Sequence, residues 1–147
     1  MRLEPGVPPA GTVRHWLDAR AASGGLAMVF PETAQELGWS DLRQAARAFA
    51  GQLTGLGVTK GESVAIVAPN GPEAVTAFFG AVYGGFRATM INLAAGREAI
   101  SYALEHSEAR FAYVDAGCRS VFDQANAAGV QTIPLEASDE DRALHDV

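Results

Sequence analysis

The sequence is poor in the features that mark secreted, membrane-spanning and nucleic-acid-binding proteins. Cys118 is its single cysteine, so no internal disulfide can form, and this suits a reducing cytoplasm. Acidic residues outnumber Lys and Arg by 17 to 11, for a formal charge of −6, and such a balance disfavours binding to nucleic acid or anionic lipid. The N-terminal residues lack the apolar stretch of a signal peptide. We therefore expect a cytoplasmic protein without a nucleic-acid partner.

Long apolar runs are absent as well. The most apolar segment, Ala74–Tyr83, falls far short of the roughly 20 residues that a membrane-spanning helix needs. Hydrophobic residues nevertheless make up 48% of the 147 residues, and a chain of this length can bury a core without disulfides or metals. We therefore expect one globular domain with no membrane span.

The sequence also lacks the motifs by which many enzymes hold phosphates or activate a nucleophile. Neither G-x-x-x-x-G-K-[ST] nor G-x-G-x-x-G occurs, and no serine stands in G-x-S-x-G. His15, His106 and His145 lie in separate segments and, with Cys118, show no metal-ligand spacing. These histidines are interpreted as structural or surface residues.

Cys118 and three glutamates remain as candidates for chemistry. Cys118 follows Gly117 near a predicted helix N-terminus, where the pKa of a thiol can fall, although we favour a buried structural cysteine. Glu98, Glu105 and Glu108 fit a solvated helix face and its exit better than a catalytic pair of carboxylates. On this reasoning we assign no catalytic, cofactor-binding or metal-binding residue to the chain.

The turn Asn70-Gly71-Pro72 poses the phosphate question directly, because it joins a predicted strand to a predicted helix. A phosphate-binding loop needs successive free backbone N–H groups at a helix N-terminus, usually with a Lys or Arg. Pro72 removes one of those donors, and proline is common at the first position of a helix. We therefore interpret the turn as a helix start.

Apolar periodicity predicts strands that alternate with helices. Strands are expected at 26–30, 35–39, 63–68, 87–92, 110–114 and 130–133, and helices after Thr12, from Ser40, from Pro72, at 97–107 and at 118–128. The helix from Pro72 is apolar nearly all round, which predicts that it is sandwiched between other elements. The alternation predicts a three-layer α/β fold: a mostly parallel sheet with helices on both faces, after a short N-terminal β-hairpin. We expect an α/β subdomain over 1–135 and an acidic, frayed tail over 136–147.

Two stretches of the chain carry a family resemblance. The first is WSDLRQAARAFAGQLTGLGVTKGESVAIVAPNGPEAV, with an aromatic residue, Ser, an acid and Leu, then a helix, a Leu-x-x-x-Gly-Val turn and a Val-Ala-Ile strand. The second is AFFGAVYGGFRATMINLAAGREAISYALEHSEARFAYV, with a Gly-rich helix end, a strand closing on Asn92, a helix and a strand. In this order they resemble the first two core motifs of the adenylate-forming (AMP-dependent) enzymes, and most closely the CoA ligases for aromatic or fatty acids.

The resemblance has departures that touch loops. Glu62 stands where the family usually has Asp, Leu93 replaces the usual Pro after Asn92, and Gly85-Phe86 replaces a common Gly-Ala. Absent altogether are the family's Ser/Thr/Gly-rich loop ending in Lys, its aromatic-Gly-x-Thr-Glu segment, its Thr-Gly-Asp and its C-terminal lysine. The resemblance therefore implies fold and lineage without a catalytic residue.

What the resemblance implies is the N-terminal subdomain of an acid:CoA ligase. Such an enzyme converts a carboxylate and ATP to an acyl-adenylate and then to an acyl-CoA thioester, so ATP, Mg and CoA belong to the full-length parent. We expect this fragment to be inactive alone and to hold no cofactor. Its partner would be the remainder of the ligase, or a second copy that covers exposed apolar surface. The alternatives are a free-standing, non-catalytic α/β module that binds a partner or self-associates, and an independent flavodoxin-like or Rossmann-like nucleotide binder.

Overall fold

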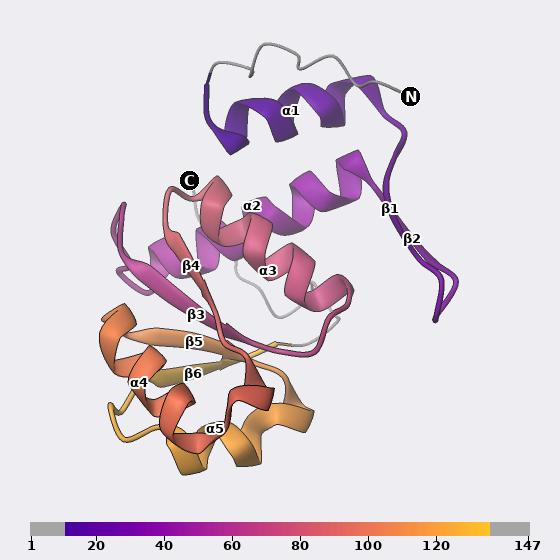
Figure 1. Ribbon diagram of the computed structural model, residues 1–147. Helices are drawn as coiled ribbons and strands as arrows, with labels where there is room; N and C mark the ends of the chain where they lie inside the picture. The colour runs from indigo at the N-terminus through magenta and orange to yellow at the C-terminus, as the bar shows by residue number, and fades with distance from the viewer. Residues whose placement is uncertain (1–10, 136–147) are drawn as a thin grey trace, which may run out of the picture.

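The computed structural model describes residues 11–135, and within them strands and helices alternate as the sequence predicts (Figure 1). The helices are α1 (Val13–Ser23), α2 (Trp39–Gly55), α3 (Pro72–Tyr83), α4 (Arg97–Ser107) and α5 (Arg119–Ala125), with short 3-10 helices η1 (Leu93–Ala95) and η2 (Ala116–Cys118). The strands are β1 (Leu26–Phe30), β2 (Gln35–Gly38), β3 (Ser63–Val67), β4 (Arg87–Met90), β5 (Phe111–Val114) and β6 (Gln131–Pro134). The predicted tail over 136–147 lies outside the described residues.

Four of the strands form a parallel sheet in the order β4-β3-β5-β6. β1 and β2 pair antiparallel as a separate hairpin, which stands beside the layers of the sheet and its helices (Figure 1). In the same view α2 and α3 cover one face of the sheet and α4 and α5 cover the other. The predicted three-layer α/β fold with a short N-terminal hairpin is thereby confirmed.

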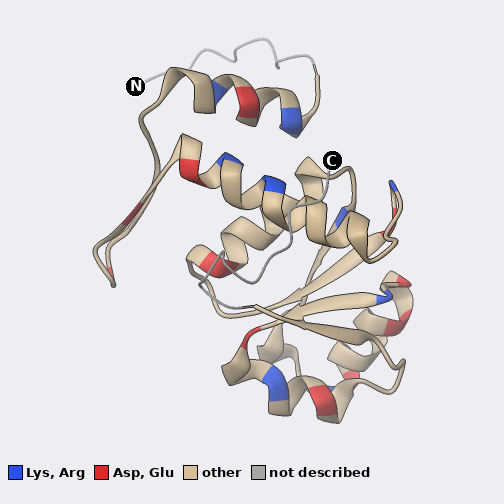
Figure 2. Ribbon diagram, turned by 180° about the vertical axis from the view of Figure 1, so that it is seen from behind, with Lys and Arg blue, Asp and Glu red and all other residues tan. Residues whose placement is uncertain are grey.

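The core follows from the alternation of side chains along β3 and β5, whose residues are all buried. Val64 and Ile66 of β3 belong to the cluster that includes α2 and α3, whereas Ala65 and Val67 belong to the cluster that includes α4 and α5. Both faces of these strands are covered, so they are apolar without a break. Figure 2 shows the charged residues on helices, loops and the hairpin, away from the middle of the sheet.

α2 and α3 approach each other closely at Gly80. A Cβ atom added at Gly80 would lie 2.3 Å from the Cβ atom of Phe49, so only glycine allows this approach. Across the sheet face, the ring of Phe49 meets Tyr113 edge-on with ring centroids 4.9 Å apart. The helix pair therefore rests on the sheet through aromatic contacts.

The prediction that α3 is sandwiched is correct on two sides and wrong on a third. Ala77 and Ala81 pack in the cluster on the sheet, and Val75 and Phe79 pack against a cluster that includes Leu17, Leu42 and Tyr83. Phe78 instead keeps 37% of its surface exposed. Apolar residues all round a helix do not show which of its sides lacks a neighbouring element. Here the side of α3 that carries Phe78 faces a cleft.

One carboxylate of α1 bonds to both helices of the pair. Asp18 accepts hydrogen bonds from Arg43 Nε at 2.8 Å and from the Tyr83 hydroxyl at 2.9 Å. Burial opposes ionisation of Asp18, but these two hydrogen bonds outweigh it and hold the pKa of Asp18 below its usual value. Burial and the bond to Asp18 raise the pKa of Tyr83.

Several predicted boundaries shift where side chains cap the backbone. The strand expected at 87–92 ends at Met90, because Asn92 accepts a hydrogen bond from Ala94 N at 3.0 Å and starts η1. The helix expected at 118–128 ends at Ala125, because the Asn126 amide bonds both the N–H and the carbonyl of Val130 at 2.9 Å. These side chains turn the chain earlier than periodicity indicates.

Candidate functional site

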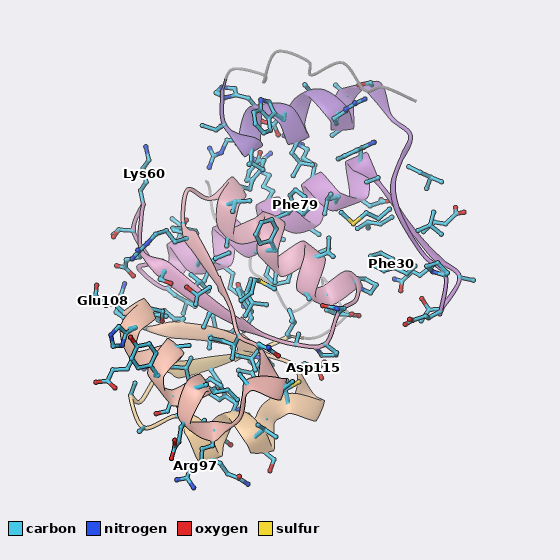
Figure 3. All side chains as sticks on the ribbon, viewed as in Figure 1. Phe30, Lys60, Phe79, Arg97, Glu108 and Asp115 are labelled. Carbon is cyan, nitrogen blue, oxygen red and sulfur yellow. The ribbon has the colours of Figure 1, made fainter. Side chains whose placement is uncertain are left out.

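The carboxyl ends of the parallel strands carry the polar residues that a ligand could meet. Asn70 follows β3, Asn92 follows β4 and Asp115 follows β5. In open α/β sheets ligands bind outside these ends, at the point where the strand order reverses, which here lies between β3 and β5. Figure 3 shows Asp115 at this end of the sheet, with Lys60 and Glu108 at the other.

The turn Asn70-Gly71-Pro72 starts α3, as predicted, and its geometry does not fit a phosphate. Gly71 is extended, with φ 168° and ψ −175°, and Pro72 is the first helical residue without an N–H to offer. The Glu73 carboxylate curls back, with Oε2 3.6 Å from where a Gly71 Cβ would lie. A carboxylate in the first turn already complements the positive end of the helix dipole, so it repels a second anion.

Asn92 and Asp115 use their side chains locally. Asp115 accepts a hydrogen bond from Gly117 N at 3.0 Å and caps η2, as Asn92 caps η1. Cys118 is free and buried, as favoured. Burial first and the Asp115 charge second raise the pKa of its thiol, which disfavours the alternative of a reactive thiol at this position.

The histidines do not come together. His15 belongs to the capping box at the start of α1, where its Nδ1 lies 3.1 Å from Thr12 Oγ1. The His106 ring stacks on the Tyr102 ring with the two ring centroids 3.9 Å apart. His145 lies outside the described residues. Between residues 11 and 135 no group of three or more His, Cys, Asp and Glu side chains could hold a metal ion.

The three glutamates are exposed on one helix or directly after it, as predicted for a solvated helix face and its exit. Glu98 and Glu105 lie on α4, and Glu108 follows it with a left-handed φ of 58°. The assignment of no catalytic, cofactor-binding or metal-binding residue stays a prediction. In the described part of the chain no helix has the length and apolarity that crossing a membrane requires.

An apolar cleft of about 460 Å³ lies between the β1–β2 hairpin and α3, and we call it the hairpin–α3 cleft. Its lining residues are Met28, Phe30, Pro31, Glu32, Thr33, Asn70, Gly71, Pro72, Ala74, Val75, Phe78, Phe79 and Met90. Asn70 and Met90 also line a second hollow of about 380 Å³ over the carboxyl ends of β3 and β4. Sequence reasoning missed the cleft, because its walls come from three separate segments. In the sequence, the doublet Phe78-Phe79 is the one feature that could have indicated the cleft.

Comparison with known proteins relates most of the chain to one enzyme family. The profile of the family described as AMP-binding enzyme matches residues 15–146. The 2-methylpropanoate–CoA ligase CCL4 of Humulus lupulus is 28% identical over 97 residues, which are 66% of this chain and 17% of that protein.

Solved structures agree with this match. The N-terminal domain of FACL13 from Mycobacterium tuberculosis superposes with a TM-score of 0.79 at 26% identity, over 92% of this chain and 37% of that one. O-succinylbenzoate coenzyme A synthetase (MenE) from Bacillus subtilis, in complex with AMP, shares the fold with a TM-score of 0.75 at 24% identity, over 90% of this chain and 34% of that one. The chain thus spans a minor part of the length of each of these proteins.

Proposed function

The chain belongs to the AMP-binding enzyme family, and we propose that it forms the N-terminal scaffold of an acid:CoA ligase. The parent enzyme would convert a carboxylic acid and ATP to an acyl-adenylate and then to a CoA thioester. The superposition on the N-terminal domain of FACL13, over 92% of this chain, is the observation that carries the proposal. A free-standing module has no comparable support.

The start of α3 does not fit the phosphates of ATP. At the start of α3, Pro72 lacks an N–H and the Glu73 carboxylate lies beside the helix end. We therefore assign no step of the reaction to these residues. In the parent enzyme ATP would supply the adenylyl group, Mg its counter-charge, and CoA the thiol that accepts the acyl group.

The contribution proposed for this chain is structural support. The buried strands β3 and β5 fix the loops at their carboxyl ends, and the close contact at Gly80 locks α2 to α3 above them. Rigid elements hold a binding site more precisely than loops do. A scaffold of this kind would set the position of downstream segments and would have no adenylation activity alone.

The proposed partner is the remainder of such a ligase. Leu26 and Val29 expose 53% and 55% of their surfaces on the hairpin, which suits burial against another segment. Self-association through the same surface is the alternative, and light scattering separates the two: a mass above that of the 15.4 kDa chain at micromolar concentration indicates a homo-oligomer. We also propose a cytoplasmic location, where the buried Cys118 thiol would stay reduced.

The coding sequence that follows codon 147 tests the lineage, since the parent enzyme needs a Gly-rich loop ending in Lys and a Thr-Gly-Asp. Their presence in a continuous frame supports the proposal, and their absence from every frame contradicts it. A second test mixes the purified chain with the separately expressed remainder. Recovery of acid-dependent ATP–pyrophosphate exchange on mixing supports the scaffold role, whereas equal exchange by the remainder alone contradicts it.

A further inference from the structure

We propose that the hairpin–α3 cleft is a binding site for a neutral aromatic molecule. The proposal goes beyond the scaffold role and does not depend on it. It rests on three properties of the cleft: the side chains of its walls, its preformed shape and its charge.

The walls of the cleft are aromatic rings and thioethers. Phe30 lines it from the hairpin, and Phe78 and Phe79 line it from α3. Figure 3 shows Phe30 and Phe79 on these two elements. The rings of Phe78 and Phe79 meet edge-on with centroids 5.4 Å apart. Met28 and Met90 add sulfur atoms, which make favourable contacts with ring edges. These walls suit a flat aromatic ligand better than an alkyl chain.

The cleft is open and supported from behind. Val75 and Phe79 pack against a cluster with Leu17, so the α3 wall is held in place. Phe78 and Met90 remain 37% and 52% exposed, so a ligand can reach them without a change of fold. The volume of about 460 Å³ lies within the ~300–1,000 Å³ typical of small-molecule sites. Because one side is open to solvent, we expect a dissociation constant on the order of 1 mM for a ligand of about 13 non-hydrogen atoms.

The charge of the lining selects a neutral ligand. Glu32 is the one charged side chain among the lining residues, which include no Lys, Arg or His. A carboxylate that entered would lose water without gaining a cation and would meet Glu32. Asn70 and Thr33 offer an amide and a hydroxyl to one polar group of a neutral ligand.

The terminal segment of the chain is a poor occupant by the same argument. Residues 136–147 contain five acidic residues, Glu136, Asp139, Glu140, Asp141 and Asp146, against one Arg. Their charge has the sign of Glu32, so they would be repelled from the cleft. The remainder of the proposed ligase is absent from the experiment below, so a second copy of the chain is the competing occupant that this experiment distinguishes.

Methionine methyl NMR on the 147-residue chain tests the proposal, because its three methionines are Met1 and the two lining residues. The probes are indole-3-acetamide, which is neutral, and indole-3-acetate, which has the same ring and a negative charge. We expect the acetamide to shift the Met28 and Met90 signals in a saturable way and the acetate to bind at least about tenfold more weakly. Met90→Leu assigns the Met90 signal, and Met28→Leu distinguishes the Met28 signal from that of Met1.

Three variants locate the binding. Phe78→Ala is expected to weaken acetamide binding at least about fivefold, and Val121→Ala, at a similarly exposed apolar residue of α5, to leave it unchanged. Glu32→Gln is expected to strengthen binding of the acetate and to leave the acetamide unaffected. Equal binding of both probes, or unchanged binding in Phe78→Ala, would overturn the proposal. So would Met28 and Met90 shifts that follow protein concentration without any probe, because a second copy would then fill the cleft.

Discussion

The sheet region (β3–β6 with α2 to α5) and the hairpin region (α1, β1 and β2) differ in how much of their apolar surface is buried. In the sheet region, every residue of β3 and β5 is buried between two layers of helices. In the hairpin region, Leu26 and Val29 expose more than half of their surfaces, and within residues 11–135 β1 and β2 pair only with each other. A hairpin of two strands has little stability of its own. The central strands of the sheet region are thus covered on both faces, whereas the hairpin region leaves apolar side chains exposed.

Two phenylalanine variants, one at a buried and one at an open position, test this difference in packing most directly. Phe122 of α5 is fully buried, whereas Phe78 on the open side of α3 is not. We expect Phe122→Ala to lower the free energy of unfolding by about 3–5 kcal/mol and Phe78→Ala by about 1 kcal/mol or less. Urea unfolding followed by circular dichroism measures both. Equal losses would show that the side of α3 that faces the hairpin is packed as tightly as α5.

A second pair of variants tests the contact between α2 and α3, the helices against which the hairpin region rests. A methyl group at Gly80 would collide with Phe49, so we expect Gly80→Ala to cost about 1–3 kcal/mol of unfolding free energy. Gly71 is the N-cap of the same helix α3; its backbone is extended, and an added Cβ atom would meet no atom closer than 3.6 Å. Gly71→Ala should therefore stay within about 0.5 kcal/mol of the wild type. The denaturant midpoints of the two variants measure this difference. A Gly80→Ala variant as stable as the wild type would contradict the close contact between α2 and α3.

The anchor of the hairpin region, Asp18, should have a smaller and pH-dependent effect. Asp18→Asn keeps the shape but removes the charge that Arg43 and Tyr83 bond, and we expect a loss of about 1 kcal/mol near pH 7 after allowance for solvent screening. The pKa of Asp18 is lowered by folding from 3.8. Its stabilisation is therefore complete well above pH 3.8 and is lost as the pH falls through the lower, folded pKa.

Unfolding free energies of the wild type and Asp18→Asn at several pH values measure this dependence. The difference between the two proteins should be constant near neutral pH and shrink below pH 3.8. Tyr83→Phe, which leaves the bond to Arg43, should show part of the loss and a weaker dependence on pH. A difference that grows on acidification would contradict the account of Asp18.

The least effect is expected on the exposed face of the hairpin. Val29→Thr adds a hydroxyl to a side chain that already faces water. The unfolding free energy should change by no more than about 0.5 kcal/mol. A loss above about 1 kcal/mol, measured by the same urea titration, would show that something covers this face.

The sequence predicted the sheet region better than the hairpin region for a physical reason. Apolar runs such as Ser63–Val67 can be satisfied only by burial on both faces, so pattern alone specifies their place. The two hairpin strands were also found, but their alternation does not say what lies against Val29. The boundaries missed at Asn92 and Asn126 depend on single side-chain hydrogen bonds that periodicity cannot register.

The candidate site was less predictable than the fold. The start of α3 at Pro72 was read correctly, because proline at that position has one common use. The burial of Cys118 was also predicted correctly, but the direction of its thiol pKa was left open, because it depends on tertiary packing that the local motif does not contain. The hairpin–α3 cleft needs Phe30, Phe78 and Met90 from distant segments, so it becomes visible only once the chain is folded.

ATP–pyrophosphate exchange by the purified 147-residue chain, with a panel of aliphatic and aromatic carboxylic acids, tests the central claim that this chain is a scaffold without adenylation machinery. The account predicts no acid-dependent exchange above the protein-free blank. Exchange that depends on both the acid and this chain would contradict it.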